Sequence, residues 1–258
     1  METSIERLFG LAGNVALVTG SSAGIGLALA QGLAAAGAHL VINGRDAAKV
    51  DGVVTQLRAA GARADAAPFD VTDPPAIKAA VRRIEAQIGP IDILVNNAGI
   101  QRRTPLEDFP EATWREVMRT NLDSVFFVSQ AVAQFMIPRK RGRIVNIGSV
   151  QCELARPNIA PYTASKGGVK MLTKGMATDW GKYGIRANAI GPGYFRTELN
   201  QALVDDEKFS AWLTARTPMG RWGDVDELVG AAIFLVSNAS SFVNGHMLYV
   251  DGGITACL

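Results

Sequence analysis

The feature that most limits the fold is a short β-rich run followed directly by a glycine-rich turn and a helix. Residues 14–19 read NVALVT, the turn over 20–26 reads GSSAGIG, and residues 27–36 are rich in Ala and Leu before Gly37. Because glycine has no Cβ, such a turn lets backbone N–H groups and a helix N-terminus face the diphosphate of a dinucleotide. Glycines also serve ordinary loops, but the flanking strand and helix favour a nucleotide-binding turn.

The alternation of strand-like runs with helical segments continues along the chain. The further runs are residues 39–43, 62–68, 91–95, 144–147, 185–190 and 246–250. This order predicts an α/β fold with a doubly wound, Rossmann-type parallel sheet of about seven strands, helices on both faces, and ligands at the carboxyl ends of the strands. No repeat, low-complexity tract or linker interrupts the sequence, so residues 1–258 are predicted to form a single domain. The polar segment 197–219 is predicted to be a small, mobile helical lid.

Composition excludes several classes of function. The formal net charge is +2 and the basic residues are spread along the chain, so no nucleic-acid partner is expected. Two cysteines, Cys152 and Cys257, make no disulfide framework and favour a reducing compartment. No run approaches the roughly 20 apolar residues of a membrane span and the N-terminus lacks the apolar core of a signal peptide, which favours the cytoplasm. The two histidines, His39 and His246, have no ligand cluster nearby, so no metal is expected.

The end of the second strand-like run bears on the choice of cofactor. Gly44 and Arg45 stand where an acidic residue would accept hydrogen bonds from a free ribose 2′-hydroxyl. Arg45 could instead clamp a 2′-phosphate, which favours NADP over NAD. The alternative is a solvent-exposed arginine beside Asp46, which is expected to cap the next helix in either case. Asp70, at the end of the third run, could accept a hydrogen bond from the adenine amino group.

A tyrosine and a lysine lie one helical turn apart. Tyr162 and Lys166 are spaced i, i+4, and a cation beside a phenol favours the phenolate, so Lys166 could make Tyr162 a usable proton donor and acceptor. Taken alone, the pair is more often an ordinary surface pair. Ser149 follows a strand and would open on the same crevice as the glycine turn, or merely form a turn. Asn121 lies on the apolar face of a long helix predicted over residues 110–136, as a satisfied core amide or as a catalytic residue.

Together these motifs form one ordered set. They are Thr19-Gly20-xxx-Gly24-x-Gly26, Asn96-Asn97-Ala98-Gly99, Asn121, Ser149, Tyr162-xxx-Lys166 and Pro192-Gly193. Over nearly the whole chain this set resembles the short-chain dehydrogenase/reductase family. The resemblance implies that Tyr162 is the acid-base group, that Lys166 lowers its pKa and binds the nicotinamide ribose, and that Ser149 holds the substrate oxygen. Asn121 would anchor a water through which Lys166 exchanges protons with solvent.

The resemblance also implies a cofactor site along the strand ends. The expected NADP contacts are Gly20, Ser22, Gly24, Ile25, Gly26, Arg45, Asp70, Val71, Asn97, Ala98, Gly99, Tyr162, Lys166, Pro192, Gly193 and Thr197. The Thr197 hydroxyl and the backbone after Gly193 would hold the nicotinamide carboxamide. Ala23 stands where many NADP-using relatives have a basic residue, so the preference for NADP depends on Arg45. Because the family commonly forms tetramers, a homotetramer is expected, with the apolar end 254–258 as a possible subunit contact.

Within the family, four stretches are similar to the bacterial subfamily that interconverts D-gluconate and 5-keto-D-gluconate. They are residues 99–103, 191–195, 221–223 and 242–246. A polyhydroxy acid needs a cation for its carboxylate and hydrogen-bonding side chains for its hydroxyls. The expected substrate residues are Arg102, Arg103, Ser149, Gln151, Glu153, Asn158 and Tyr194. Either arginine could instead make a solvent or subunit contact, and Glu153 would repel a nearby carboxylate.

Other activities remain open at this point. A 3-oxoacyl-acyl-carrier-protein reductase shares the fold and the tetrad, and could use the basic run 139–143 to dock an acidic carrier. The polar residues between Ser149 and Tyr162 argue against an acyl chain. Another polyol or keto-sugar-acid dehydrogenase is a further alternative. A non-catalytic nucleotide-binding protein is disfavoured because the tetrad is intact.

Overall fold

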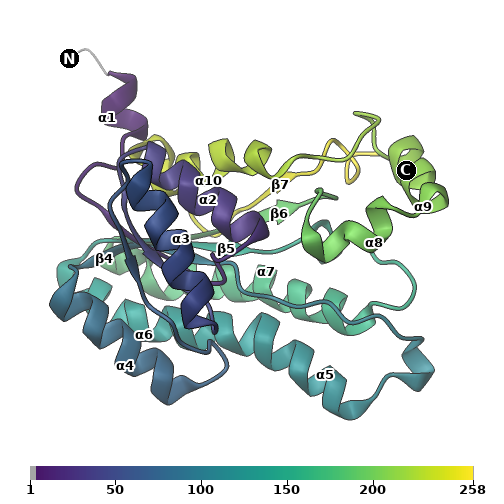
Figure 1. Ribbon diagram of the computed structural model, residues 1–258, viewed down its shortest axis with the longest axis horizontal. Helices are drawn as coiled ribbons and strands as arrows, with labels where there is room; N and C mark the ends of the chain where they lie inside the picture. The colour runs from purple at the N-terminus through teal and green to yellow at the C-terminus, as the bar shows by residue number, and fades with distance from the viewer. Residues whose placement is uncertain (1–3, 258) are drawn as a thin grey trace.

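A parallel sheet of seven strands forms the centre of the computed structural model, which describes residues 4–257 (Figure 1). In spatial order the strands are β3 (Ala64–Ala66), β2 (His39–Ile42), β1 (Val15–Val18), β4 (Ile91–Asn96), β5 (Gly142–Ile147), β6 (Ile185–Pro192) and β7 (Met247–Val250). Every pairing is parallel, and the order of the strands reverses between β1 and β4. A crevice for ligands forms at such a reversal. The predicted doubly wound α/β fold is therefore confirmed.

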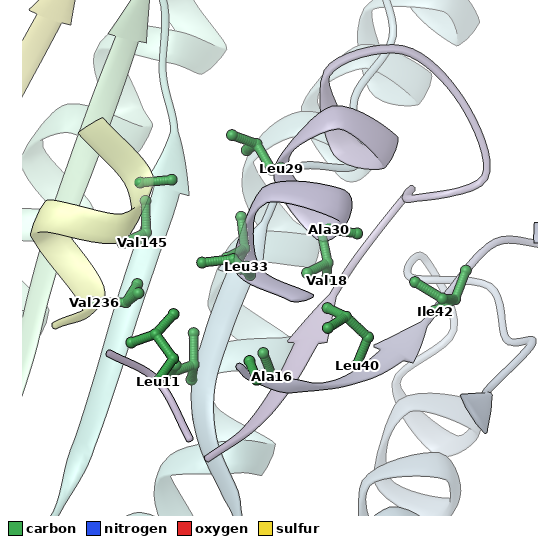
Figure 2. Packing of buried hydrophobic residues seen from close by; sticks show 14 of the residues in the cluster. Leu11, Ala16, Val18, Leu29, Ala30, Leu33, Leu40, Ile42, Val145 and Val236 are labelled. Carbon is green, nitrogen blue, oxygen red and sulfur yellow. The ribbon is translucent and has the colours of Figure 1, made fainter. Parts of the chain in front are cut away.

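Helices cover both faces of the sheet, as Figure 1 shows. On one face lie α2 (Gly24–Ala35), α3 (Ala47–Ala59) and α10 (Val229–Val236), and on the other α4 (Pro74–Gln87), α6 (Ser124–Arg139) and α7 (Ala160–Trp180). Figure 2 shows Leu29 and Leu33 of α2 packed among side chains of the central strands such as Val18 and Val145. β4 is buried along its whole length, as expected for a strand between two helical layers. None of the described helices combines the length and the apolar character needed to cross a membrane.

Aspartate side chains cap two of the helices that cover the sheet. The Asp46 carboxylate accepts a hydrogen bond from the Lys49 N–H and caps α3, as predicted. Asp73 caps α4 in the same way, and two prolines occupy the first turn of that helix, where a missing N–H costs nothing. The remaining helices are α1 (Ile5–Phe9), α5 (Glu111–Met118), α8 (Gln201–Val204) and α9 (Glu207–Arg216), with 3₁₀ turns η1 (Leu106–Asp108), η3 (Val150–Cys152), η4 (Gly181–Tyr183), η5 (Glu198–Asn200), η6 (Val225–Leu228) and η7 (Asn238–Ser240). α1 had no counterpart among the expected elements.

The prediction of one continuous helix over residues 110–136 is wrong, because the helix is interrupted in its middle. α5 ends at Met118, a π-helical turn η2 spans Arg119–Asp123, and α6 continues from Ser124. The wider turn carries one extra residue and changes the direction in which the following residues face. Accordingly α5 contacts α7, whereas α6 packs on β4 and α4. Asn121 lies within this turn and is fully buried.

The segment expected to be a lid contains η5, α8 and α9, which lie at one end of the molecule near the C-terminus (Figure 1). Leu213 of α9 is completely buried in a small apolar cluster with Val150, Trp222 and Ile254. The helical content of the segment matches the expectation, and its mobility stays a prediction. Leu258, at the tip of the apolar C-terminal end, lies outside the described residues.

Candidate active site

A single cavity of about 680 Å³ runs along the carboxyl ends of the strands, from the glycine turn to the segment that follows β6. It brings together most of the residues that the sequence identified as cofactor contacts. They are Gly20, Ser22, Gly24, Ile25, Arg45, Asp70, Val71, Asn97, Ala98, Gly99, Tyr162, Lys166, Pro192, Gly193 and Thr197. Of the expected substrate residues, Arg102, Arg103, Ser149, Gln151 and Tyr194 also line it. Gly26, Asn121, Glu153 and Asn158 do not.

The glycine turn between β1 and α2 is shaped by close backbone packing. Gly20 and Gly24 have φ angles of +61° and +55°, a region that side chains with a Cβ rarely adopt. A Cβ on Gly26 would lie 2.4 Å from the Gly20 carbonyl oxygen and from Asn97 Nδ2. Asn97 Nδ2 itself donates to the carbonyl oxygens of Thr19 and Gly20, both at 3.0 Å. Gly26 is therefore required beneath the turn and does not face the cavity.

At the far end of the cavity, the carboxyl end of β2 carries no acidic residue. A Cβ on Gly44 would lie 3.2 Å from the Ser22 Oγ, so this strand end closes directly over the glycine turn. Arg45 is exposed, lines the cavity, and forms no ion pair within residues 4–257. Asp70 also lines the cavity, and its Oδ1 accepts hydrogen bonds of 2.8 Å from both the N–H and the hydroxyl of Thr72.

At the opposite end, β5 and α7 place three polar side chains together. Lys166 is 4% exposed, its Nζ donates to the Ile147 carbonyl oxygen at 2.7 Å, and the same Nζ lies 5.7 Å from the centre of the Tyr162 ring. The i, i+4 spacing thus places both groups on the cavity side of α7. Ser149 follows β5, accepts a hydrogen bond of 3.1 Å from the Gln151 N–H, and hydrogen-bonds the Tyr162 phenol.

Burial shifts the pKa values of Tyr162 and Lys166 and so determines their protonation at neutral pH. It raises the pKa of Tyr162 to about 12, and the hydrogen bond with Ser149 opposes this shift without cancelling it. Burial also lowers the pKa of Lys166 to about 8. The direction for Tyr162 is opposite to the one expected from Lys166 alone, because the cost of charging a buried phenol exceeds the effect of the neighbouring groups. At neutral pH the site therefore holds a neutral phenol, ready to donate a proton, beside a charged lysine.

Asn121 occupies a structural position behind this pair. Its Nδ2 donates to the Ile100 carbonyl oxygen at 2.9 Å and to the Ser165 Oγ at 3.2 Å, and its Oδ1 accepts from the Ile100 N–H at 2.8 Å. The side chain thus has the partners expected of a satisfied core amide, and it ties the π-helical turn to α7 and to the loop after β4. Its involvement in proton exchange stays a prediction.

The expected substrate residues divide into two groups. Arg102 binds Glu116 through two hydrogen bonds of 2.7 and 3.1 Å, and Gln151 is 6% exposed with its Oε1 lacking a partner among the described residues. Glu153, by contrast, is held outside the cavity by an ion pair with Lys170 and a 2.8 Å hydrogen bond from the Tyr249 hydroxyl. Asn158 is exposed on the loop before α7, where its backbone oxygen accepts from Thr104. The structure does not bring Glu153 or Asn158 to the site.

Arg156 is among the cavity residues that the sequence did not identify. Arg156 lines the cavity, and its guanidinium carbon lies 5.4 Å from the centre of the Phe209 ring in α9. The available signal was the one arginine between Ser149 and Tyr162, the interval from which Gln151, Glu153 and Asn158 were chosen. Its contact partner is 53 positions away, too distant for any local pattern to reveal.

The fold and this site are those of an NAD(P)-dependent oxidoreductase. A protein-family model described as enoyl-(acyl carrier protein) reductase matches residues 20–255. Together with the parallel sheet, the glycine turn and the tyrosine–lysine pair on α7, this match shows that the chain belongs to the short-chain dehydrogenase/reductase family.

Particular relatives narrow the comparison. The chain is 62% identical over 251 residues to a gluconate 5-dehydrogenase of Gluconobacter oxydans, covering 97% of this chain and 98% of the relative. It is 55% identical over 250 residues to a 5-keto-D-gluconate 5-reductase of Escherichia coli, with the same coverage. Among solved structures, a gluconate 5-dehydrogenase from Burkholderia cenocepacia in complex with NADP and tartrate is 59% identical, with a TM-score of 0.97 over 99% of this chain and 100% of that one.

Proposed function

We propose that this protein is an NADP-dependent dehydrogenase that reversibly converts D-gluconate to 5-keto-D-gluconate. The observation that carries the proposal is the meeting of Ser149, Tyr162 and Lys166 at one end of the same cavity whose other end is the glycine turn. The relatives named gluconate 5-dehydrogenase and 5-keto-D-gluconate 5-reductase support the choice of substrate.

The residues of the cavity fit a dinucleotide. Gly20 and Gly24 leave the backbone of the turn open to a diphosphate at the start of α2. The Thr197 hydroxyl is buried without a hydrogen-bond partner among the described residues, as expected of a group that awaits a ligand such as a carboxamide. Arg45 has no ion pair in this part of the chain and would bind a 2′-phosphate, which is the reason for NADP. Ligand-bound relatives with NADP agree with this choice.

Side chains of the protein transfer the proton of the reaction. When bound, NADP supplies the carbon that accepts or donates the hydride. In reduction, the neutral Tyr162 phenol donates its proton to the ketone oxygen, and in oxidation its phenolate accepts the proton of the hydroxyl. Ser149 hydrogen-bonds the same substrate oxygen and stabilises the negative charge that develops there. Lys166 remains charged at neutral pH and stabilises the phenolate once the proton has left.

The substrate's carboxylate requires a cation. Arg103 lines the cavity and forms no ion pair within the described residues, whereas Arg102 is already bound to Glu116. We therefore assign the binding of the carboxylate to Arg103 and the binding of the hydroxyls to Gln151 and Tyr194. The Gln151 Nε2 lies 3.4 Å from the Tyr194 hydroxyl oxygen. Burial lowers the pKa of Arg103, and the nearby charge of Arg156 lowers it further, so a bound anion would relieve unfavourable charge at this point.

The structure offers no support for the carrier-protein alternative. The basic run 139–143 lies where β5 begins, at the edge of the sheet opposite the cavity. Arg139 binds Glu85, Arg141 binds Asp92, and Arg143 donates to Asn14 and Asn238. These three arginines have partners within the molecule. They lie near the start of β5, whereas the site lies at the end of that strand.

The test is a comparison of oxidation rates with NADP and with NAD, using D-gluconate, other sugar acids and polyols, followed by nicotinamide absorbance. Turnover of gluconate with NADP preferred is the expected result. Turnover of acetoacetyl thioesters without turnover of gluconate would replace the proposal by the carrier-protein reductase.

We also propose a homotetramer that works in the cytoplasm. Trp114, Phe126 and Met171, on α5, α6 and α7, are 41%, 40% and 61% exposed, which is unusual for large apolar side chains on neighbouring helices. Burial of this helical face between subunits would account for their exposure in a single chain. Light scattering of the purified protein measures the number of subunits directly.

A further inference from the structure

Two arginines, Arg103 and Arg156, line the cavity without a carboxylate partner among the described residues. Arg103 and Arg156 line the same cavity, and the charge of Arg156 lowers the pKa of Arg103. Neither of them has an ion pair within residues 4–257. Glu116, a carboxylate of the cavity lining, is bound to Arg102, and Glu198, another, forms no ion pair with either arginine. Two cations without ion-pair partners in one partly buried cavity favour the binding of an anion.

Arg156 also contacts the segment that follows β6. Its guanidinium lies over the Phe209 ring of α9, a favourable cation–π arrangement, and its charge favours the phenolate form of Tyr194, opposing the effect of burial on the pKa of that group. The rings of Tyr194, Phe209 and Trp222 form one cluster, with centres 5.8 to 6.2 Å apart. Arg156 thus joins the loop before α7 to Phe209 of α9, beside the apolar contacts that Val150 and Leu154 make in the cluster of Leu213.

We propose that Arg156 binds the carboxylate of the sugar acid together with Arg103, and that its contact with Phe209 couples this binding to the position of α9. The inference rests on the proposed function, since it assigns a further residue to the same substrate. A planar guanidinium can present one edge to a carboxylate while its face remains on an aromatic ring. The substrate's carboxylate would then neutralise the arginine pair and fix α9 against the cavity.

The experiment separates charge recognition from structural support. The dissociation constant of D-gluconate is measured by calorimetry on NADPH-saturated enzyme, where no turnover occurs, for the wild type and for Arg156→Leu, Arg156→Lys and Phe209→Leu. D-gluconamide, which has the same hydroxyls but no charge, is the matched ligand, and tartrate is a second carboxylate. Arg196→Leu is the matched control variant, because Arg196 is an exposed arginine near the cavity that does not line it. NADPH affinity checks that each variant is folded.

In Arg156→Leu we expect gluconate and tartrate to bind on the order of 10- to 100-fold more weakly, with gluconamide changed less than about twofold, because only charged ligands lose a charge-assisted hydrogen bond. Arg156→Lys should lie between the two. Phe209→Leu should leave the preference for gluconate over gluconamide in place while removing the slowing of hydrogen exchange that gluconate causes in residues 207–216 of the wild type.

Equal weakening of gluconate and gluconamide in Arg156→Leu, or no weakening of either, overturns the assignment of the carboxylate to Arg156. Unchanged protection of residues 207–216 in Phe209→Leu overturns the coupling. If the wild type binds both carboxylates through Arg156 but oxidises no sugar acid, the proposed function fails and the inference stands. If the wild type oxidises gluconate while Arg156→Leu behaves like Arg196→Leu, the inference fails and the function stands.

Discussion

Two walls of the cavity are built in different ways. The inner wall consists of Ser149, Tyr162 and Lys166 and comes from the end of β5 and from one face of α7. The outer rim, defined here as Arg102, Arg103, Arg156, Tyr194 and the segment 197–219, comes from loops and short helices. Lys166 is 4% exposed, whereas the Arg102 side chain is 43% exposed.

We expect the inner wall to carry out the reaction and the outer rim to select the ligand. On the inner wall, burial shifts the pKa values of Tyr162 and Lys166, and the surrounding regular elements fix their geometry. On the outer rim, charged side chains such as Arg102 keep much of their solvation, and a contact such as that of Arg156 with Phe209 joins positions far apart in the sequence. A substitution on the inner wall should therefore change the rate, and a substitution on the rim should change which ligand is bound.

The largest expected effect tests the inner wall. Tyr162→Phe removes the proton donor while keeping the ring, so turnover should fall by about 10²- to 10⁴-fold, the usual contribution of a positioned acid-base group. NADP affinity should change less than about threefold, as measured by fluorescence of bound NADPH. Tyr183→Phe, a tyrosine outside the cavity, is the control. Normal turnover in Tyr162→Phe would remove the distinction between the two walls.

The next effect concerns the cofactor end of the cavity. Arg45→Gln should weaken NADP binding by roughly 10- to 100-fold and leave NAD binding unchanged, because only the 2′-phosphate loses a charge-assisted partner. The measurement is the ratio of kcat/KM for the two cofactors. Arg63→Gln, an exposed arginine that does not line the cavity, should leave this ratio as it is. A ratio unaffected by Arg45→Gln would move the phosphate site elsewhere.

A third prediction concerns how the buried Lys166 of the inner wall affects the free energy of unfolding. The pKa of Lys166 is about 8 in the folded protein and near 10.5 when unfolded, so the unfolded chain binds more protons between these values and wild-type stability rises with pH across that window. Lys166→Met removes this cost and should be more stable by about 1 to 3 kcal/mol at pH 7, although inactive. Denaturant unfolding at pH 7 and pH 10 should show the advantage shrinking. An equal advantage at both values would contradict the shifted lysine.

The smallest effect concerns a residue excluded from the rim. Glu153→Gln should leave KM for the sugar acid within about twofold, because the carboxylate is bound to Lys170 and Tyr249 outside the cavity. Stability should fall by less than about 1 kcal/mol, as for other exposed ion pairs. A tenfold change in KM, with stability unchanged, would return Glu153 to the substrate site.

The inner wall could be predicted from the sequence because its spacing is local. Tyr162 and Lys166 share one helix face, and Ser149 follows a strand whose apolar run is plain. The sheet was equally accessible, since each strand ends in a glycine or polar motif. The rim was not, because the ion pair of Glu153 and the ring beneath Arg156 join positions far apart in the chain.

The π-helical turn η2 was missed for a different reason. The apolar spacing of residues 110–136 continues on both sides of Asn121 without a break. Periodicity alone therefore predicts one continuous helix. The interruption arises because α5 must contact α7 while α6 must contact β4, and only tertiary packing imposes both directions.

This turn also has a consequence for how the gene can change. Each residue of a regular helix advances the chain by about 100°, so the in-frame loss of one codon within Arg119–Asp123 would straighten the helix and rotate α5 relative to α6 by about that angle. Val117 would then leave its buried position although no amino acid type that packs there had been replaced. The connection at Asp205–Asp206, between α8 and α9, is exposed, and an insertion before Asp206 would leave that residue in place as the cap of α9. Natural variation in chain length should therefore collect in that connection and be absent from the turn that carries Asn121.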